Sequence, residues 1–144
     1  MSRITTLMGS LPLMGRRVLI VEDDRPSLKA LTRLLTVSGY DTICAPTLAE
    51  ATQKLILHPD VVLLDLMLPD GHGVELLRRL RHRNDPARVA LITAASGSVL
   101  DEALALRPDA TFRKPFDPQS LLAWLADADR PVGLGPQACP LGPN

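Results

Sequence analysis

The stretch VVLLDLMLPDGHG, residues 61–73, decides the fold because it joins a buried strand to a helix through a charged residue. Its first four residues are apolar without alternation, which is typical of a strand covered on both faces in a parallel sheet. The strand then ends on Asp65, and PDGHG follows as a turn in which Gly71 and Gly73 are expected to supply backbone freedom. Asp65 is therefore either an ordinary strand-ending residue or a residue placed where chemistry happens.

Outward from this stretch, short apolar runs alternate with amphipathic segments. The predicted strands lie within residues 18–21, 40–45, 60–65, 88–93 and, most weakly, 109–116. The predicted helices lie within residues 25–40, 47–58, 73–83, 98–107 and 117–128. Strand–helix units in such regular alternation predict an α/β fold, a doubly wound five-stranded parallel sheet with helices on both faces.

Three helix starts carry their own signals. Thr47 and Glu50 stand at the spacing of a capping box. Ser98 could cap the helix that it begins, and Asp117 is expected to cap the last helix, with Pro118 at its first position. These signals predict where the chain turns from loop into helix.

Composition indicates one domain. The chain has 144 residues, of which 46% are hydrophobic, enough for a single core. We expect a flexible extension over residues 1–15, one domain over residues 16–128 and a disordered Pro- and Gly-rich tail over residues 129–144. Lys+Arg and Asp+Glu are equal at 16 each, so overall charge gives no sign of binding to DNA or to an anionic membrane.

Other features exclude whole classes of protein. Cys44 and Cys139 are too few for a disulfide scaffold and are predicted to be free thiols. His58, His72 and His82 do not stand at zinc-ligand spacing. No apolar run approaches the ~20 residues of a membrane span, and the N-terminus does not resemble a signal peptide. The expected location is the cytoplasm, without membrane insertion.

Polar residues collect where the predicted strands end. These residues are Glu22, Asp23, Asp24, Asp65, Thr93 and Lys114. The carboxyl ends of parallel strands share one edge of the sheet, where ligands bind. Clustered carboxylates repel one another unless a cation lies among them, and Mg²⁺ prefers oxygen ligands of this kind. Asp65 could then accept a phosphoryl group, with Thr93 and Lys114 supplying a hydrogen bond and a positive charge to its oxygens.

Four segments carry a resemblance to a known family. They are VLIVEDD (residues 18–24), VVLLDLMLPDGHGVELLRRLR (61–81), LITA (91–94) and KPF (114–116). In this order and spacing the chain resembles the receiver domain of bacterial two-component response regulators, over residues 16–128 or so. The resemblance implies a flavodoxin-like three-layer sandwich that is phosphorylated on an aspartate with the help of Mg²⁺.

The resemblance also implies roles for single residues near the metal. Glu22 and Asp23 match the acidic pair of the family, with Asp23 the more direct Mg²⁺ ligand, while Asp24 falls one place beyond the pair. Asp65 matches the phosphorylated aspartate and a further metal ligand. Met67 matches the residue whose backbone carbonyl helps to bind the metal.

Around the phosphoryl group, Thr93 matches the hydroxyl that moves on activation, and Ala94 matches its small neighbour. Lys114 matches the phosphoryl-binding lysine, and the Lys114–Pro115 bond is often cis in the family. One departure is Thr111, which stands where the family usually has a switch aromatic. Phe112 should point to the opposite sheet face from Thr111, so the switch role does not transfer to it.

Two surface features have simpler interpretations. The basic segment RRLRHR, residues 78–83, is expected to be a solvated helix surface, with a docking patch as the alternative. Trp124 is expected to pack the last helix, with a partner anchor as the alternative.

The expected function is that of a stand-alone phosphoacceptor and not of an enzyme beyond its own phosphorylation and dephosphorylation. A histidine kinase or histidine phosphotransferase would phosphorylate Asp65, and an unknown protein target would read the result. The absence of a DNA-binding domain after residue 130 argues against direct DNA binding. A phosphatase of the haloacid dehalogenase type would need a second aspartate where Met67 stands. A receiver-like interaction module that works without phosphorylation is the remaining alternative.

Overall fold

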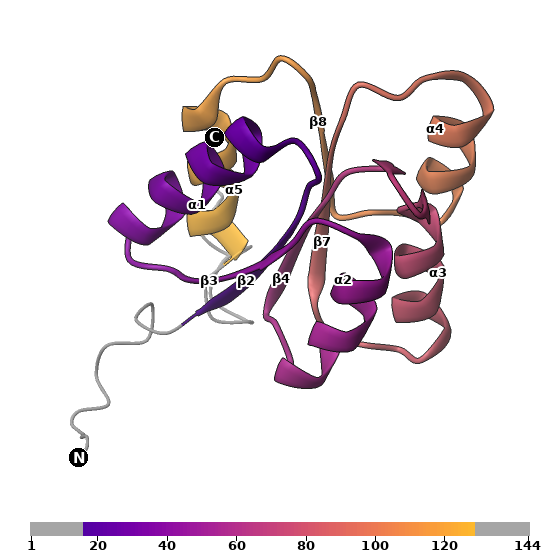
Figure 1. Cartoon of the computed structure of the whole chain (residues 1–144), viewed down its shortest axis with the longest axis horizontal. Helices are drawn as coiled ribbons and strands as arrows, with labels where there is room; N and C mark the ends of the chain where they lie inside the picture. Colours follow the sequence, from indigo (N-terminus) through magenta and orange to yellow (C-terminus); the bar gives the residue numbers. More distant parts are fainter. Residues whose placement is uncertain (1–15, 129–144) are drawn as a thin grey trace, which may run out of the picture.

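The structure, a computed structural model, describes residues 16–128. The expectations for residues 1–15, for residues 129–144 and for Cys139 lie outside the described residues. A parallel sheet runs through the centre in the order β3-β2-β4-β7-β8 (Figure 1). Its strands are β2 (Arg17–Val21), β3 (Asp41–Ala45), β4 (Val61–Leu64), β7 (Arg88–Thr93) and β8 (Ala110–Arg113). The predicted five-stranded parallel sheet is confirmed.

Helices cover both faces of the sheet and form the three expected layers (Figure 1). Their bounds are α1 (Arg25–Val37), α2 (Leu48–Lys54) with the 3₁₀ turn η1 (Leu55–Leu57), α3 (Val74–His82), α4 (Gly97–Ala105) and α5 (Pro118–Ala128). One buried cluster lies under α1 and α5, and a second lies under α2, α3 and α4. Alternate residues of β2 enter the two clusters, so the uninterrupted apolar runs follow from burial on both faces.

Two of the three predicted helix starts are correct. Thr47 Oγ1 accepts a hydrogen bond of 3.1 Å from Glu50 N–H, and Asp117 Oδ1 accepts one of 3.0 Å from Gln119 N–H. The prediction for Ser98 is wrong, because α4 already begins at Gly97 after Ser96. Gly97 takes φ 65°, a conformation open to glycine, so the chain turns before Ser98 is reached.

The segment that follows Asp65 is more ordered than a simple turn. Its strands β5 (Met67–Leu68) and β6 (Gly71–His72) pair as a short antiparallel ladder. At the tip, the carboxylate of Asp70 accepts hydrogen bonds of 2.7 Å from Leu48 N–H and 2.9 Å from Ala49 N–H. These bonds lower the pKa of Asp70 and satisfy free amides at the start of α2. The hairpin is thereby tied to α2.

Gly73 differs from the expectation of backbone freedom. Its φ of −59° and ψ of −20° are ordinary helical values. A Cβ added here would lie 2.2 Å from the backbone oxygen of Asp65, and Gly73 N–H donates a 2.7 Å hydrogen bond to the Leu66 carbonyl. Glycine is needed at this position because two backbone segments approach too closely for any side chain.

Candidate functional site

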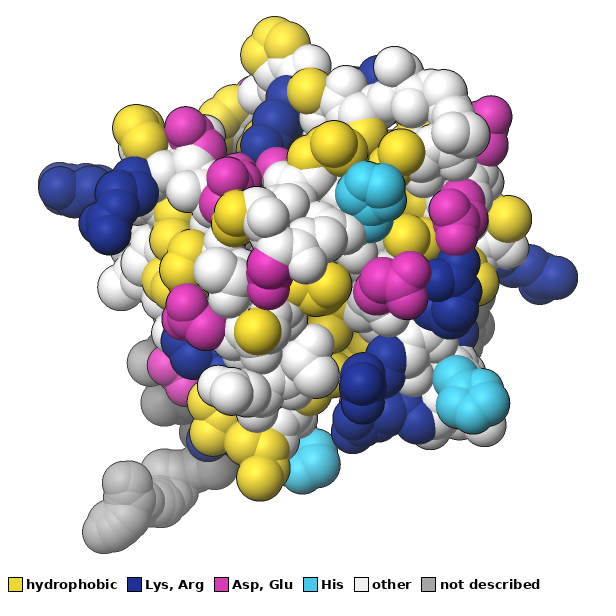
Figure 2. All heavy atoms as spheres, turned by 45° about the vertical axis from the view of Figure 1, so that its right-hand side comes forward, with side chains coloured by type: hydrophobic (Ala, Val, Ile, Leu, Met, Phe, Trp, Pro, Cys, Tyr) yellow, Lys and Arg dark blue, Asp and Glu magenta, His cyan; other side chains and the backbone are white. Residues whose placement is uncertain are grey.

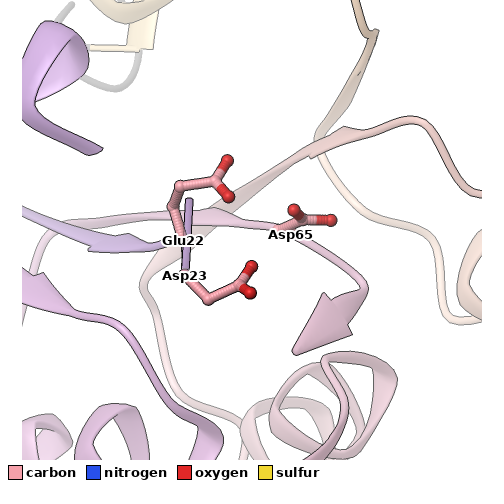
Figure 3. A group of neighbouring side chains, drawn as sticks. All are labelled: Glu22, Asp23 and Asp65. Atoms are coloured by element: carbon pink, nitrogen blue, oxygen red, sulfur yellow. The ribbon is translucent and has the colours of Figure 1, made fainter. Parts of the chain in front are cut away.

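The carboxyl ends of β2 and β4 bring three carboxylates together (Figure 3). Val21 and Leu64 are partners in the parallel register, so the residues that follow them, Glu22 and Asp65, are neighbours. Asp65 N–H donates a 3.0 Å hydrogen bond to the Val21 carbonyl, which continues the ladder to the site. Ligand oxygens of Glu22, Asp23 and Asp65 all lie within 4.8 Å of one another. Parallel pairing therefore produces the predicted acidic cluster.

Lys114 lies between two of these carboxylates. Its Nζ is 2.6 Å from Glu22 Oε1 and 3.0 Å from Asp65 Oδ2. Glu22 and Asp65 are only 2% and 7% exposed, so both carboxylates are held away from water. Burial raises the pKa of Glu22. Burial alone would lower the pKa of Lys114, but hydrogen bonds to Glu22 and Asp65 outweigh it and raise that pKa. The ammonium is thus kept charged beside Asp65.

The donor set suits a hard divalent cation. Three carboxylates face a single ammonium, so ionisation of all three leaves an excess of negative charge. Oxygen ligands at the mouth of a partly open site match the preference of Mg²⁺, which keeps several waters. Asp23 is exposed, whereas Glu22 and Asp65 are buried, so a cation could enter from the side of Asp23. Met67 N–H donates a 3.2 Å hydrogen bond to Asp65 Oδ1, which places the Leu66–Met67 peptide beside the cluster. The Met67 carbonyl belongs to the next peptide along the chain.

Asp24 has a different role from its acidic neighbours. Its Oδ2 accepts hydrogen bonds from Ser27 N–H at 3.1 Å and from Ser27 Oγ at 2.6 Å. The bond from the Ser27 hydroxyl is the larger cause of the lowered pKa of Asp24, and the bond from Ser27 N–H is the next. The bond from Ser27 N–H also caps α1. Asp24 N–H also donates to Glu22 Oε2 at 3.1 Å, which helps to orient that carboxylate. The signal for this cap was present in the sequence as an Asp three residues before Ser27.

A cavity of about 330 Å³ opens beside Asp65. Its lining consists of Asp65, Met67, Ala94, Ala95, Ser96, Val99 and Lys114. Thr93 is completely buried and is not part of this lining, and its Oγ1 accepts a 3.0 Å hydrogen bond from Ala95 N–H. The structure therefore brings Asp65 and Lys114 to one cavity, whereas Thr93 is buried and does not line it.

Beyond Lys114 the chain crosses to the other face of the sheet. The Lys114–Pro115 bond is cis. Phe112 packs against Phe116 and Trp124, with ring centroids 5.9 and 6.3 Å apart, in the cluster under α1 and α5. Thr111 is in register with Leu91, which belongs to the opposite cluster. The prediction that Phe112 and Thr111 face opposite ways is confirmed, as is the packing role of Trp124.

The basic segment 78–83 is not simply solvated. Arg78 bonds to Glu75 at 3.1 Å and to Glu102 of α4. Arg81 donates to the carbonyls of Leu106 at 3.0 Å and Arg107 at 2.8 Å, just after α4. Figure 2 shows basic and acidic side chains next to each other on this side of the molecule. The predicted solvated surface is confirmed for Arg79, His82 and Arg83, which are exposed. Arg78 and Arg81 in addition fasten α4 to α3, a contact that a single helix pattern does not reveal.

No helix in residues 16–128 is long and apolar enough to cross a membrane.

Comparison with known proteins agrees with this geometry. Residues 18–126 match the family model of the response regulator receiver domain. The chain is 30% identical over 133 residues to the phosphate regulon transcriptional regulatory protein PhoB of Pseudomonas aeruginosa, covering 90% of this chain and 58% of that protein. It is 37% identical over 116 residues to the DNA-binding response regulator MtrA of Mycobacterium tuberculosis, covering 76% of this chain and 49% of that protein.

The chain thus spans about half the length of these curated relatives. Among solved structures, it resembles a CheY-like receiver domain protein from Methanospirillum hungatei with a TM-score of 0.74 and 27% identity. That match covers 80% of this chain and 94% of the other. With a family model covering most of the sequence and a relative that is 30% identical over nearly all of it, the chain belongs to the response regulator receiver domain family.

Proposed function

We propose that this receiver domain accepts a phosphoryl group on Asp65 from a histidine kinase or histidine phosphotransferase, in a Mg²⁺-dependent reaction in the cytoplasm. One observation carries the proposal. The Asp65 carboxylate borders a cavity of about 330 Å³ while the Lys114 ammonium lies 3.0 Å from its Oδ2. A nucleophile, a fixed positive charge and room for a phosphoryl group meet at one place.

In the proposed reaction a carboxylate oxygen of Asp65 attacks phosphorus. The bond from phosphorus to the donor nitrogen breaks, and the histidine leaves with its electron pair and takes up a proton. Glu22, Asp23, Asp65 and the Met67 carbonyl would hold Mg²⁺, which when bound neutralises charge on the phosphoryl oxygens. Lys114 already contacts Asp65 and can follow the charge as it moves onto the phosphoryl group. Thr93 can donate a hydrogen bond once its hydroxyl turns toward the cavity.

Phosphorylation of the purified chain tests the proposal. With Mg²⁺ and phosphoramidate, we expect intact-mass measurement to show the gain of one phosphoryl group, and we expect Asp65→Asn to show none. Asp60→Asn is the matched control, because Asp60 precedes the same strand at its opposite end and bonds to Arg17 N–H instead. Equal labelling of wild type and Asp65→Asn would refute the proposal. A module that works without phosphorylation would neither gain mass nor bind Mg²⁺ at this cluster.

The lifetime of the phosphoryl group is expected to depend on Met67. This side chain is 50% exposed beside the cavity and has no polar atom that could orient an attacking water. We therefore expect the wild-type aspartyl phosphate to outlast seconds, and Met67→Asn to lose it about tenfold faster, less than the ~100-fold that a true general base contributes. The measurement is the decay of the phosphorylated mass in Mg²⁺ buffer after removal of the donor. Equal decay of both proteins would contradict the role of position 67.

We also propose that the output of this domain is a protein–protein contact and that the domain itself does not bind DNA directly. The balance of 16 basic and 16 acidic residues in the chain supports this part of the proposal. By name, PhoB is a transcriptional regulatory protein and MtrA is a DNA-binding response regulator. A pull-down with phosphorylated wild type against Asp65→Asn tests the output, since retention of the same proteins by both forms would contradict it.

A further inference from the structure

Arg113 lies next to Lys114 at the end of β8, and it had no place in the expected site. Its Nη1 donates a hydrogen bond to the carbonyl of Ala95, in the segment that joins β7 to α4. This contact links residues 18 positions apart in the sequence. It connects the last residue of β8, immediately before Lys114, to the wall of the cavity beside Asp65.

Ala95 is held at both ends of its backbone. Its N–H donates to Thr93 Oγ1 at 3.0 Å, and its carbonyl accepts from Arg113. Ala94, Ala95 and Ser96 together line the cavity. Two side chains, the Thr93 hydroxyl and the Arg113 guanidinium, thus bond to the backbone of this wall at Ala95.

Arg113 and Lys114, at the end of β8, contact different parts of the site. Lys114 reaches the carboxylates, while Arg113 reaches the wall. Thr93 is the register partner of Arg113, and its carbonyl accepts a 3.0 Å hydrogen bond from Lys114 N–H. Arg113 and Lys114 are consecutive residues, and Thr93 pairs with Arg113 in the sheet. A displacement of Lys114 or Thr93 is therefore expected to strain the hydrogen bond between Arg113 and Ala95.

The far end of α4 is held by contacts with α3, whereas the bond from Arg113 lies just before its start. Arg78 holds Glu102, and Arg81 holds the carbonyls that follow α4. At the start of α4, Ser96 makes no side-chain capping bond. Ala95 stands immediately before this uncapped start, so the Arg113 contact is in a position to control the first turn.

We propose that Arg113 is a positioning residue that holds the cavity wall and the start of α4 in their unphosphorylated position, and that phosphorylation of Asp65 releases this hold. Thr93 is completely buried and its Oγ1 accepts a hydrogen bond from Ala95 N–H, so we expect the hydroxyl and this wall to shift before the hydroxyl can reach a phosphoryl oxygen. The bond from Arg113 to Ala95 opposes that shift. The inference rests on the proposed function of Asp65, but the hold itself exists in the unphosphorylated protein.

The test compares Arg113→Met, which keeps length but removes the donor, with Arg113→Lys, which restores a donor. Arg88→Met is the control, since Arg88 begins β7 at the opposite edge of the sheet. In the unphosphorylated proteins we expect amide exchange at residues 100–103, whose N–H groups bond to the carbonyls of the first turn of α4, to be about 2- to 10-fold faster in Arg113→Met, the range for the loss of one ordinary hydrogen bond. Wild-type exchange in Arg113→Met would overturn the proposal.

Phosphorylation by phosphoramidate gives the second readout. We expect Arg113→Met to react about 2- to 10-fold faster, because the wall no longer has to be released, with unchanged Mg²⁺ affinity by calorimetry. Arg113→Lys should return toward the wild-type rate, and Arg88→Met should equal it. An unchanged or slower rate in Arg113→Met, or altered Mg²⁺ affinity, would overturn the proposal. Failure of wild type to react would reject the function of Asp65, and the exchange measurement would still decide whether Arg113 holds the wall.

Discussion

Replacement of Lys114 by methionine is expected to slow phosphorylation of Asp65 by at least about 100-fold, comparable to the loss of one preorganised charge-stabilising group. The Lys114 ammonium is 3.0 Å from Asp65 Oδ2 and only about a quarter exposed, at 26%, so water cannot fully replace it. Methionine has a similar volume and no charge, which isolates the electrostatic contribution. The rate is measured by intact mass with saturating Mg²⁺ and phosphoramidate.

Mg²⁺ affinity separates this effect from a general loss of structure. Without Lys114, the carboxylates of Glu22 and Asp65 lose their neighbouring cation. We therefore expect Lys114→Met to bind Mg²⁺ more tightly than wild type while it is phosphorylated more slowly. Lys54→Met is the control, since Lys54 bonds to the Cys44 carbonyl away from the site. A fall of both affinity and rate would show that Lys114 acts by supporting the fold.

Replacement of Gly73 by alanine is expected to cost about 2–3 kcal/mol of unfolding free energy, as overpacking against backbone does. The new methyl group would lie 2.2 Å from the Asp65 backbone oxygen and 3.0 Å from Leu64 Cδ1. Neither the strand end nor the helix start can move without disturbing the other. Urea denaturation measures the loss, and a lowered rate of Asp65 phosphorylation should accompany it.

Gly97→Ala distinguishes the clash from the loss of a glycine. A Cβ at Gly97 meets nothing within 4 Å, but its φ of 65° is unfavourable for alanine. We expect this variant to cost only about 1 kcal/mol, the penalty of a left-handed conformation. If both variants lose the same stability, close approach is not the reason for glycine at position 73.

The fold could be predicted from the sequence because its signals are local and repeated. Each strand is a short apolar run, and each helix has its own apolar face, so the alternation of the two determines a parallel sheet. The acidic cluster followed from the same reasoning, since parallel strands end at one edge. Glu22 and Asp65 therefore met as expected, although they are far apart in the sequence.

Features that depend on contacts between distant segments could not be predicted. Asp70 caps a helix that begins 22 residues earlier, and nothing near Asp70 in the sequence indicates this. The sequence predicts only conformational freedom at Gly73, because glycine usually serves that purpose, whereas the packed structure shows the close approach of the Asp65 backbone. The sequence places Arg81 on a solvated surface, because its carbonyl partners lie 25 and 26 residues away and leave no local signal.

The position of Lys114 between two buried carboxylates has a consequence for how the protein matures. The Lys114 ammonium already balances part of the negative charge of Glu22 and Asp65, which lowers the electrostatic cost of assembling the site before a metal ion binds. Small zinc domains behave differently, because their chains remain unfolded until the ion arrives. In this domain the binding site can therefore assemble during folding, before a metal ion binds. Metal occupancy is then decided afterwards, by the ions that its surroundings supply.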